Sequence, residues 1–190
     1  MIRFERVSEP DDFDRLARQP GLAWLAAHPD AKRPKDYWSQ FKPQLADGFR
    51  QLCAYSAMWH GDGTVDHFRS CKRHPHLIYE WSNYRYAAAW INSSKQNADD
   101  EILDPHEVED GWFEILLPSL QLVVTDAVPL ERRAQAEHTL RRLHLRDDER
   151  ILRQRRAWYA LYQEGRLTIE GLNERAPLLA RAIEKARAAP

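Results

Sequence analysis

In the first fifty residues, the hydrophobic positions form short clusters that are separated by prolines. Five prolines interrupt residues 10–43, and each limits how far a helix can extend. The clusters between them repeat with helical spacing. This pattern predicts short helices over residues 11–18, over residues 21–27 and from about Lys35 onward.

The pattern changes at residue 51, where short apolar and aromatic runs begin. The runs QLCAYSAMW and TVDHF are separated by the turn-forming HGDG, which predicts a β-hairpin over residues 51–68. After a basic loop, the segment YEWSNYRYAAAWINSSKQ has helix-like spacing, with Tyr86, Ala89 and Trp90 on one face. We therefore expect a hairpin followed by a helix.

The second half of the chain contains a strand region and then helices. Residues 112–126 alternate and are rich in β-branched residues, which predicts two strands with a break at Pro118. Acids at helix starts and Gly165 at a helix end indicate helices beyond Pro129. We expect these helices over residues 130–143, 147–164 and about 176–189.

The order of these elements predicts an α+β protein. We expect a helical N-terminal region (1–50), a central core with its following strands (51–126) and a helical C-terminal region (127–190) that together form one compact unit. Apolar residues make up 43% of the chain and include seven tryptophans, which is enough for a buried core.

Composition also indicates the cellular compartment in which we expect the protein. No run approaches the roughly 18 apolar residues of a membrane span, and the acidic start lacks the plan of a signal peptide, so we expect a cytoplasmic protein without membrane contact. In that compartment Cys53 and Cys71 are expected to be reduced. Although the net charge is only −1, acidic and basic residues are concentrated in different parts of the chain. Residues 99–126 hold nine acids and no Lys or Arg, whereas residues 31–95 hold ten bases and five acids. This distribution permits a phosphate-binding face.

Four spaced polar residues carry the candidate chemistry. Asp66 and His67 end the second expected strand, Asn83 follows His67 by sixteen positions, and Asn92 follows Asn83 by nine. A carboxylate and an amide oxygen suit a hard cation such as Mg²⁺, with Mn²⁺ or another divalent ion as the alternative. A neighbouring imidazole, whose ordinary pKa is about 6.5, suits proton abstraction from water near neutral pH.

Together, VDHF, EWSNYRYA and INSSK resemble the HNH family of nucleases, in order, in spacing and in the trailing Lys95. The resemblance covers about Cys53 to Lys95 and implies a ββα-metal core that cuts phosphodiester bonds. It implies that Asp66 and Asn92 are metal ligands and that His67 is the general base. It further implies that Asn83 holds the loop and the histidine in register.

The chain also departs from that family. Many members contain a zinc site built from two Cys-x-x-Cys pairs, whereas here Cys53 is followed by Ser56 and the second pair falls at Ala88 and Ile91. We therefore expect no structural zinc. We expect packing instead from aromatic residues, namely Tyr55, Trp59, Trp81 and Trp90. The segments YEWSNYR and Leu103–Pro105 are similar to HNH proteins of bacterial anti-phage systems that work beside an ATPase, which implies an antiviral role and an ATPase partner.

Several alternatives stay open. A single Asp-His dipeptide is usually a surface feature, and each asparagine alone could be an ordinary cap or exposed amide. DNA is the expected substrate, an RNase is the rival enzyme, and a non-catalytic nucleic-acid or protein-binding module is the rival outside enzymes. Specificity and oligomeric state are not indicated. Cations near the motif are the expected contacts to the phosphate backbone: Arg69, Lys72, Arg73, Arg85 and Lys95.

Overall fold

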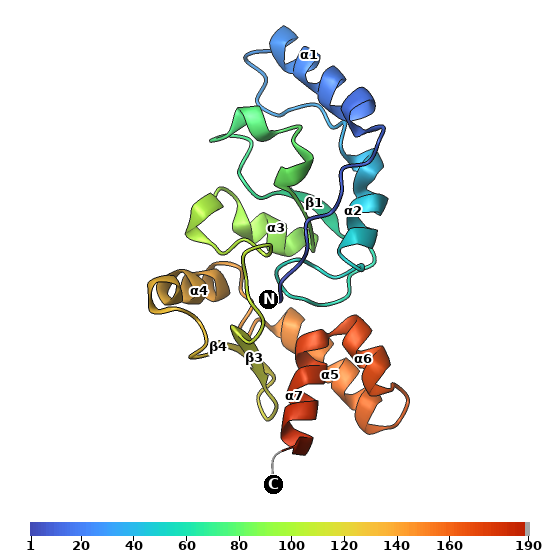
Figure 1. Cartoon of the computed structure of the whole chain (residues 1–190), viewed down its shortest axis with the longest axis vertical. Coiled ribbons are helices and arrows are strands. Elements are labelled where there is room, and N and C mark those ends of the chain that lie inside the picture. Colours follow the sequence, from blue (N-terminus) through green and yellow to red (C-terminus); the bar gives the residue numbers. More distant parts are fainter. Residues whose placement is uncertain (189–190) are drawn as a thin grey trace.

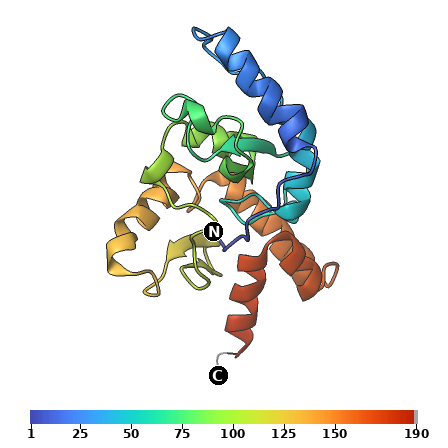
Figure 2. The ribbon, with the colours of Figure 1, turned by 45° about the horizontal axis from the view of Figure 1, so that its top comes forward.

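The computed structural model describes residues 1–188 and has an α+β fold, as expected from the order of elements. Two small antiparallel sheets, each of two strands, are surrounded by helices. Along the longest axis of the molecule, α1 (Gln19–Ala27) lies at one end and the C-terminal helices lie at the other (Figure 1). The first sheet lies between them. In the turned view of Figure 2, α1 projects from the body of the molecule.

The N-terminal region is helical, but its first two expected helices form one continuous element. A π-helical stretch, η1 (Asp14–Arg18), runs directly into α1, and a 3-10 turn, η2 (Ser39–Phe41), runs into α2 (Lys42–Gly48). The expected break at Pro20 was therefore wrong. Pro20 is the second residue of α1, at its junction with the π-helical stretch, and the helix continues through it.

The first sheet does not form the expected hairpin. Strand β1 (Thr64–His67) pairs antiparallel with β2 (Tyr84–Ala87), across a loop that contains η3 (Pro75–Leu77) and η4 (Trp81–Asn83). Residues 51–59 form a tight turn closed by the single bridge between Leu52 and Trp59. The turn contains Ala57 in the left-handed region, at φ 52°. This turn leaves the edge of β1 free to pair with β2.

The expected helix over residues 79–96 was wrong in its first half. Tyr84–Ala87 form β2, all four of whose residues are buried, and helix α3 covers only Ala89–Lys95. A strand buried on both faces has no alternation of polar and apolar positions, so its pattern resembles that of a buried helix. Tyr86 and Trp90 therefore do not share a helical face.

The second half follows the expectations closely. Strands β3 (Phe113–Leu116) and β4 (Gln121–Val124) pair antiparallel around Pro118, and 3-10 turn η5 (Asp99–Glu101) precedes them. Three of the four helices beyond them were expected: α4 (Leu130–Arg142), α5 (Glu149–Gln163) and α7 (Pro177–Ala188). Helix α6 (Ile169–Arg175) was not. The expected end of the last helix, residue 189, lies outside the described residues.

One core of buried apolar residues runs through the three regions. Phe13 packs its ring edge against Trp81 and Tyr84, at centroid distances of 5.2 and 5.8 Å, which joins the N-terminal region to the loop between β1 and β2. The indole of Trp81 donates to the carbonyl of Val7 at 2.9 Å. None of the helices within residues 1–188 has both the length and the apolar character needed to cross a membrane.

Candidate active site

Asp66, His67 and Asn92 line the same cavity, which has a volume of about 800 Å³. Asp66 and His67 end strand β1, and Asn92 lies on α3, which packs against β1. The connection between α1 and η2 contributes another part of the lining with residues 28, 29 and 31–34. The fold therefore brings together three of the four residues singled out in the sequence.

The carboxylate of Asp66 is almost fully buried and has two partners. Tyr55 donates its hydroxyl to Oδ2 at 2.5 Å, and Lys95 donates its ammonium group to Oδ1 at 3.1 Å. Burial, together with the charge of Asp66, raises the pKa of Tyr55 well above its ordinary value, so the phenol stays protonated and acts as a donor. A carboxylate has about four lone-pair positions, so two donors leave room for a further ligand.

The imidazole of His67 is held in one tautomer. Its Nε2 lies 2.9 Å from the carbonyl oxygen of Ile78, and a carbonyl can only accept, so Nε2 carries the proton and Nδ1 carries the lone pair. The rings of Trp38 and Tyr84 stand edge-on to the imidazole at 4.7 and 4.9 Å. Burial lowers the pKa of His67 below its ordinary value, which favours the neutral base at pH 7.

Asn83 is buried and joins the two ends of the loop between β1 and β2. Its Oδ1 accepts the backbone N–H of Arg69 at 2.8 Å, and its Nδ2 donates to the carbonyls of Arg69 and Leu77 at 3.0 and 3.1 Å. Leu77 precedes Ile78, whose carbonyl holds the imidazole of His67. Asn83 therefore acts on the base through the backbone and does not line the cavity itself.

The amide of Asn92 is oriented by strand β1. Its Nδ2 donates to the hydroxyl of Thr64 at 3.2 Å and to the carbonyl of Val65 at 3.4 Å. Its Oδ1 accepts no hydrogen bond from any residue between 1 and 188. The two asparagines thus differ: the hydrogen-bonding groups of Asn83 are used inside the protein, whereas the oxygen of Asn92 is left for a ligand.

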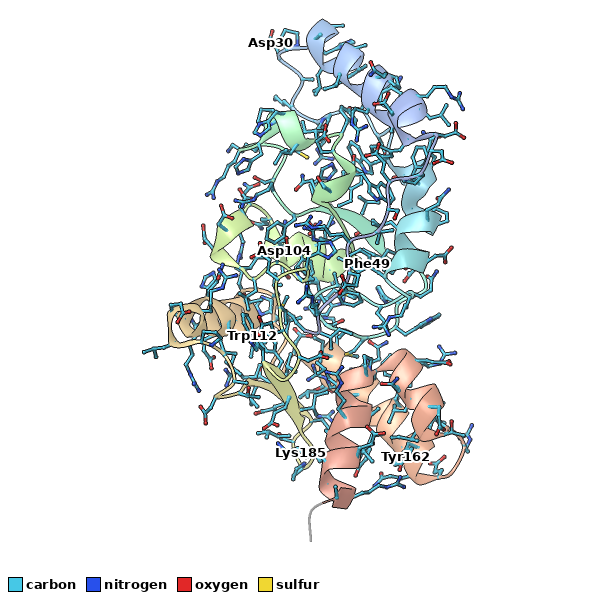
Figure 3. All side chains as sticks on the ribbon, in the orientation of Figure 1. Asp30, Phe49, Asp104, Trp112, Tyr162 and Lys185 are labelled. Carbon is cyan, nitrogen blue, oxygen red and sulfur yellow. The ribbon has the colours of Figure 1, made fainter. Side chains whose placement is uncertain are left out.

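Two of the five expected phosphate contacts are not compatible with the structure. Arg85 is 2% exposed and Lys95 is fully buried, and each is paired with a carboxylate, Asp104 for Arg85 and Asp66 for Lys95. Figure 3 shows Asp104 in the middle of the molecule. A cation enclosed in this way cannot reach a phosphate without breaking a buried ion pair.

The other three expected phosphate contacts are exposed or partly exposed, but they differ in their partners. Arg69 is paired with Asp100. Arg73 lies within 4 Å of two acids, at 3.7 Å from Asp99 and 3.8 Å from Glu101. Lys72 lines the cavity and has no acidic partner within residues 1–188. Of the five cations, Lys72 is therefore the one best placed for an anionic ligand at this cavity.

Several residues of the site could not be identified from the sequence. Trp38 stands against His67, and two cations of the cavity lining, Lys32 and Arg33, come from the connection after α1. Tyr55 was expected only as an apolar brace, and its hydrogen bond to Asp66 was missed. The proline-rich, basic composition of residues 29–35 was the one available signal for the connection.

The donor set fits a hard divalent cation held by few protein groups. Asp66 and Asn92 offer one carboxylate and one amide oxygen, and Mg²⁺ commonly binds through one or two carboxylates and completes its shell with waters and substrate phosphate. Within residues 1–188, no three side chains of His, Cys, Asp or Glu gather in a way that could hold a metal. Cys53 and Cys71 are both free thiols, and buried apolar side chains occupy positions 88 and 91.

Comparison with known proteins returns no family model and no curated sequence that matches this chain. Any assignment of function therefore depends on the motif residues and on the geometry described above.

Proposed function

We propose that this protein is a divalent-metal-dependent HNH endonuclease that hydrolyses phosphodiester bonds in DNA. The observation that carries the proposal is the hydrogen bond from Nε2 of His67 to Ile78, which leaves Nδ1 unprotonated on a residue that lines the same cavity as Asp66 and Asn92. The succession of β1, β2 and α3 is also the order that a ββα-metal core requires. The proposed roles in anti-phage defence and beside an ATPase partner depend on the sequence resemblance alone.

Each residue of the site has a separate task in this proposal. Asp66 and Asn92 would hold the cation, which supplies positive charge to the phosphate and to the leaving oxygen when it is bound. The Nδ1 atom of His67 accepts a proton from water as the water oxygen attacks phosphorus; the bond from phosphorus to the leaving sugar oxygen breaks, and that oxygen takes a proton from solvent water. Asn83 keeps the loop closed, and Trp38 and Tyr84 limit the rotation of the imidazole.

The ion pair between Asp66 and Lys95 favours a second candidate function. The ammonium group already neutralises the carboxylate, so a cation must share Asp66 with Lys95 or displace it. A non-catalytic nucleic-acid-binding module that retains the scaffold would need no such exchange. The two candidates differ in one respect that can be measured, which is whether a divalent ion binds and supports cleavage.

The decisive experiment incubates the purified 190-residue protein with plasmid DNA and, separately, with RNA, in the presence of Mg²⁺ or Mn²⁺. We expect nicked and linear DNA with the wild-type protein, and a loss of at least about a hundredfold in rate for His67→Ala, because general bases contribute on the order of 10²–10⁴. His76→Ala is the matched control, since this histidine is exposed and does not line the cavity. It should cut at the wild-type rate.

Two results would reject the nuclease assignment. One is the absence of cleavage of either nucleic acid with every divalent ion tested, and the other is unchanged cleavage in His67→Ala. Preferential cleavage of RNA would keep the reaction and replace the substrate. Asp66→Asn and Asn92→Ala separate metal binding from proton transfer, because both should raise the metal concentration needed for half-maximal rate.

A further inference from the structure

The connection between α1 and η2 places two exposed cations in the lining of the candidate active site. Lys32 and Arg33 belong to the stretch 28–34, which, apart from Asp30, lines the cavity together with Asp66 and His67. Figure 3 labels Asp30 in the same stretch, near the free end of α1. A third exposed cation, Lys72, lines the cavity from the loop after β1. Two segments far apart in sequence therefore supply positive charge to one site.

The side chains that line the cavity carry a net positive charge. Asp66 is its only acid, and that carboxylate is paired with Lys95. Lys32, Arg33 and Lys72 form no ion pair with any residue between 1 and 188, whereas seven of the fourteen exposed arginines in this part of the chain have an acidic partner within 4 Å. Three free cations around a cavity of about 800 Å³ form a site for an extended anion.

The connection is fastened to the rest of the site at its C-terminal end. The hydroxyl of Tyr79 donates to the carbonyl of Lys35 at 2.7 Å. The carboxylate of Asp36 accepts the backbone N–H groups of Trp38 and Ser39 at 3.1 and 2.9 Å, which closes a turn. Pro29 and Pro34 restrict the backbone between these contacts and α1. The two cations are thus carried on a segment of restricted shape.

We infer that Lys32, Arg33 and Lys72 bind phosphate groups of the DNA backbone on both sides of the bond to be cut. This inference rests on the proposed nuclease function. Lysine and arginine side chains without protein partners recognise phosphates by charge and carry no information about bases, so the contact is independent of sequence. The paired arginines Arg69 and Arg73 have a structural role in this assignment and are not part of the interface.

The test measures binding in the absence of divalent ions, so that cleavage cannot interfere. Fluorescence anisotropy of a short labelled DNA duplex, in EDTA and over a series of NaCl concentrations, gives the slope of log K against log[salt]. For the triple variant Lys32→Gln, Arg33→Gln and Lys72→Gln we expect a slope shallower by about 0.9 per substitution, about 2.7 in total, because each neutralised phosphate releases counterions.

A matched control removes the same charge elsewhere. Arg156→Gln, Arg166→Gln and Arg181→Gln change three exposed residues of the C-terminal helical region, at the opposite end of the molecule from α1 (Figure 1). This control should retain the wild-type slope. All six positions are exposed, and thermal melts of both triple variants should match that of the wild type.

The outcomes separate this inference from the proposed function. A triple variant with the wild-type slope overturns the inference, even if the wild-type protein cuts DNA and His67→Ala does not. A shallower slope together with a wild-type protein that cuts nothing supports the binding site and rejects the nuclease. Tight binding of a duplex RNA of the same sequence, with no measurable binding of DNA, overturns the assignment of DNA as the ligand.

Discussion

The ammonium group of Lys95 lies 3.1 Å from the carboxylate of Asp66, and both side chains are almost fully buried. Lys95 also donates to the carbonyl of His67 at 2.7 Å. One buried cation therefore contacts both residues of the Asp-His dipeptide, one through its side chain and the other through its backbone. Charge balance and strand geometry at the site depend on the same group.

Lys95→Met should strongly destabilise the fold. The substitution leaves the buried carboxylate of Asp66 with Tyr55 as its only donor, and the loss of one partner of a buried ion pair typically costs about 3–5 kcal/mol. Urea unfolding measures this loss as a lower free energy of unfolding. The double variant Asp66→Asn, Lys95→Met removes both charges and should recover a large part of the loss. If the double variant is less stable than Lys95→Met, the pair is not the cause.

Asn83→Ala should loosen the loop between β1 and β2. The substitution removes the partners of one backbone N–H and two carbonyls, each costing about 1–3 kcal/mol if it stays buried and unpaired. Hydrogen exchange followed by mass spectrometry should show faster exchange in residues 68–83. Asn83→Asp tests the two halves of the amide separately. Its Oδ1 can still accept the backbone N–H of Arg69, but its second oxygen replaces the donor Nδ2 and faces the carbonyls of Arg69 and Leu77. Unchanged exchange in both variants would contradict this role.

The pair between Arg85 and Asp104 predicts a loss of stability in acid. Burial alone would raise the pKa of Asp104, but the hydrogen bonds and charge of Arg85 outweigh burial and hold this pKa below its ordinary value of about 3.8. Asp104 therefore contributes stability that is fully present above the pKa of the unfolded chain. This contribution is lost as pH falls through the lower pKa of the folded protein.

The measurement is the free energy of unfolding between pH 6 and the lowest pH at which the protein remains folded. Asp104→Asn has no carboxyl to protonate and should show a flatter acid profile than the wild type, starting from a lower stability. Asp126→Asn, at a fully exposed carboxylate, should retain the wild-type profile. Identical acid slopes for Asp104→Asn and the wild type would count against the pair as the source.

Two glycine substitutions should have opposite signs. Alanine in a helix is more favourable than glycine by about 0.8–1.0 kcal/mol. A Cβ at Gly21 would come within 2.6 Å of the buried ring of Tyr79, and overpacking costs about 1–3 kcal/mol, so Gly21→Ala should destabilise. A Cβ at Gly171 would come too close only to the flexible end of the Leu167 side chain, at 2.9 Å, with Thr168 Oγ1 in ordinary contact at 3.6 Å, so Gly171→Ala should stabilise.

Thermal unfolding distinguishes these two cases. We expect a lower Tm for Gly21→Ala and a higher Tm for Gly171→Ala, both relative to the wild type. Gly21→Ala should also weaken DNA binding, because Tyr79 holds the connection that carries Lys32 and Arg33. A higher Tm for Gly21→Ala would show that Tyr79 can move aside at little cost.

Elements with local signals could be predicted from the sequence. Helix α5 begins where Asp148 accepts the backbone N–H of Arg150 at 3.0 Å and is followed by Gly165 at φ 67°. Both residue types mark helix ends, and both are visible in the sequence. The break at Pro118 is a signal of the same kind. Such features depend on neighbouring residues alone, so their positions agree with the expectations.

The pairing of β1 with β2 could not be predicted in this way. A loop of sixteen residues, 68–83, separates the two strands, and the choice of partner depends on long-range packing. The sequence between residues 51 and 68 also offered a plausible hairpin with a good turn. The hairpin over residues 51–68 does not form. Strand β1 pairs instead with Tyr84–Ala87, and all four of those residues are buried in that pairing.

The same distinction between local sequence signals and long-range packing applies to the residues of the candidate site. The spacing of Asp66, His67 and Asn92 predicted three residues that line one cavity. Lys95 was assigned to phosphate because it follows the motif, but it lies four residues after Ile91 and therefore on the buried face of α3. Trp38, Lys32 and Arg33 come from a segment with no fixed spacing to the motif, so no local pattern could reveal them.

Tyr79 joins the connection between α1 and η2 to the segment that holds His67. Its hydroxyl holds the carbonyl of Lys35, its ring supports α1 at Gly21, and its chain neighbour Ile78 supplies the carbonyl that fixes the imidazole of His67. In the proposed nuclease, the segment that carries Lys32 and the carbonyl that fixes the imidazole of His67 are therefore both anchored at residues 78 and 79.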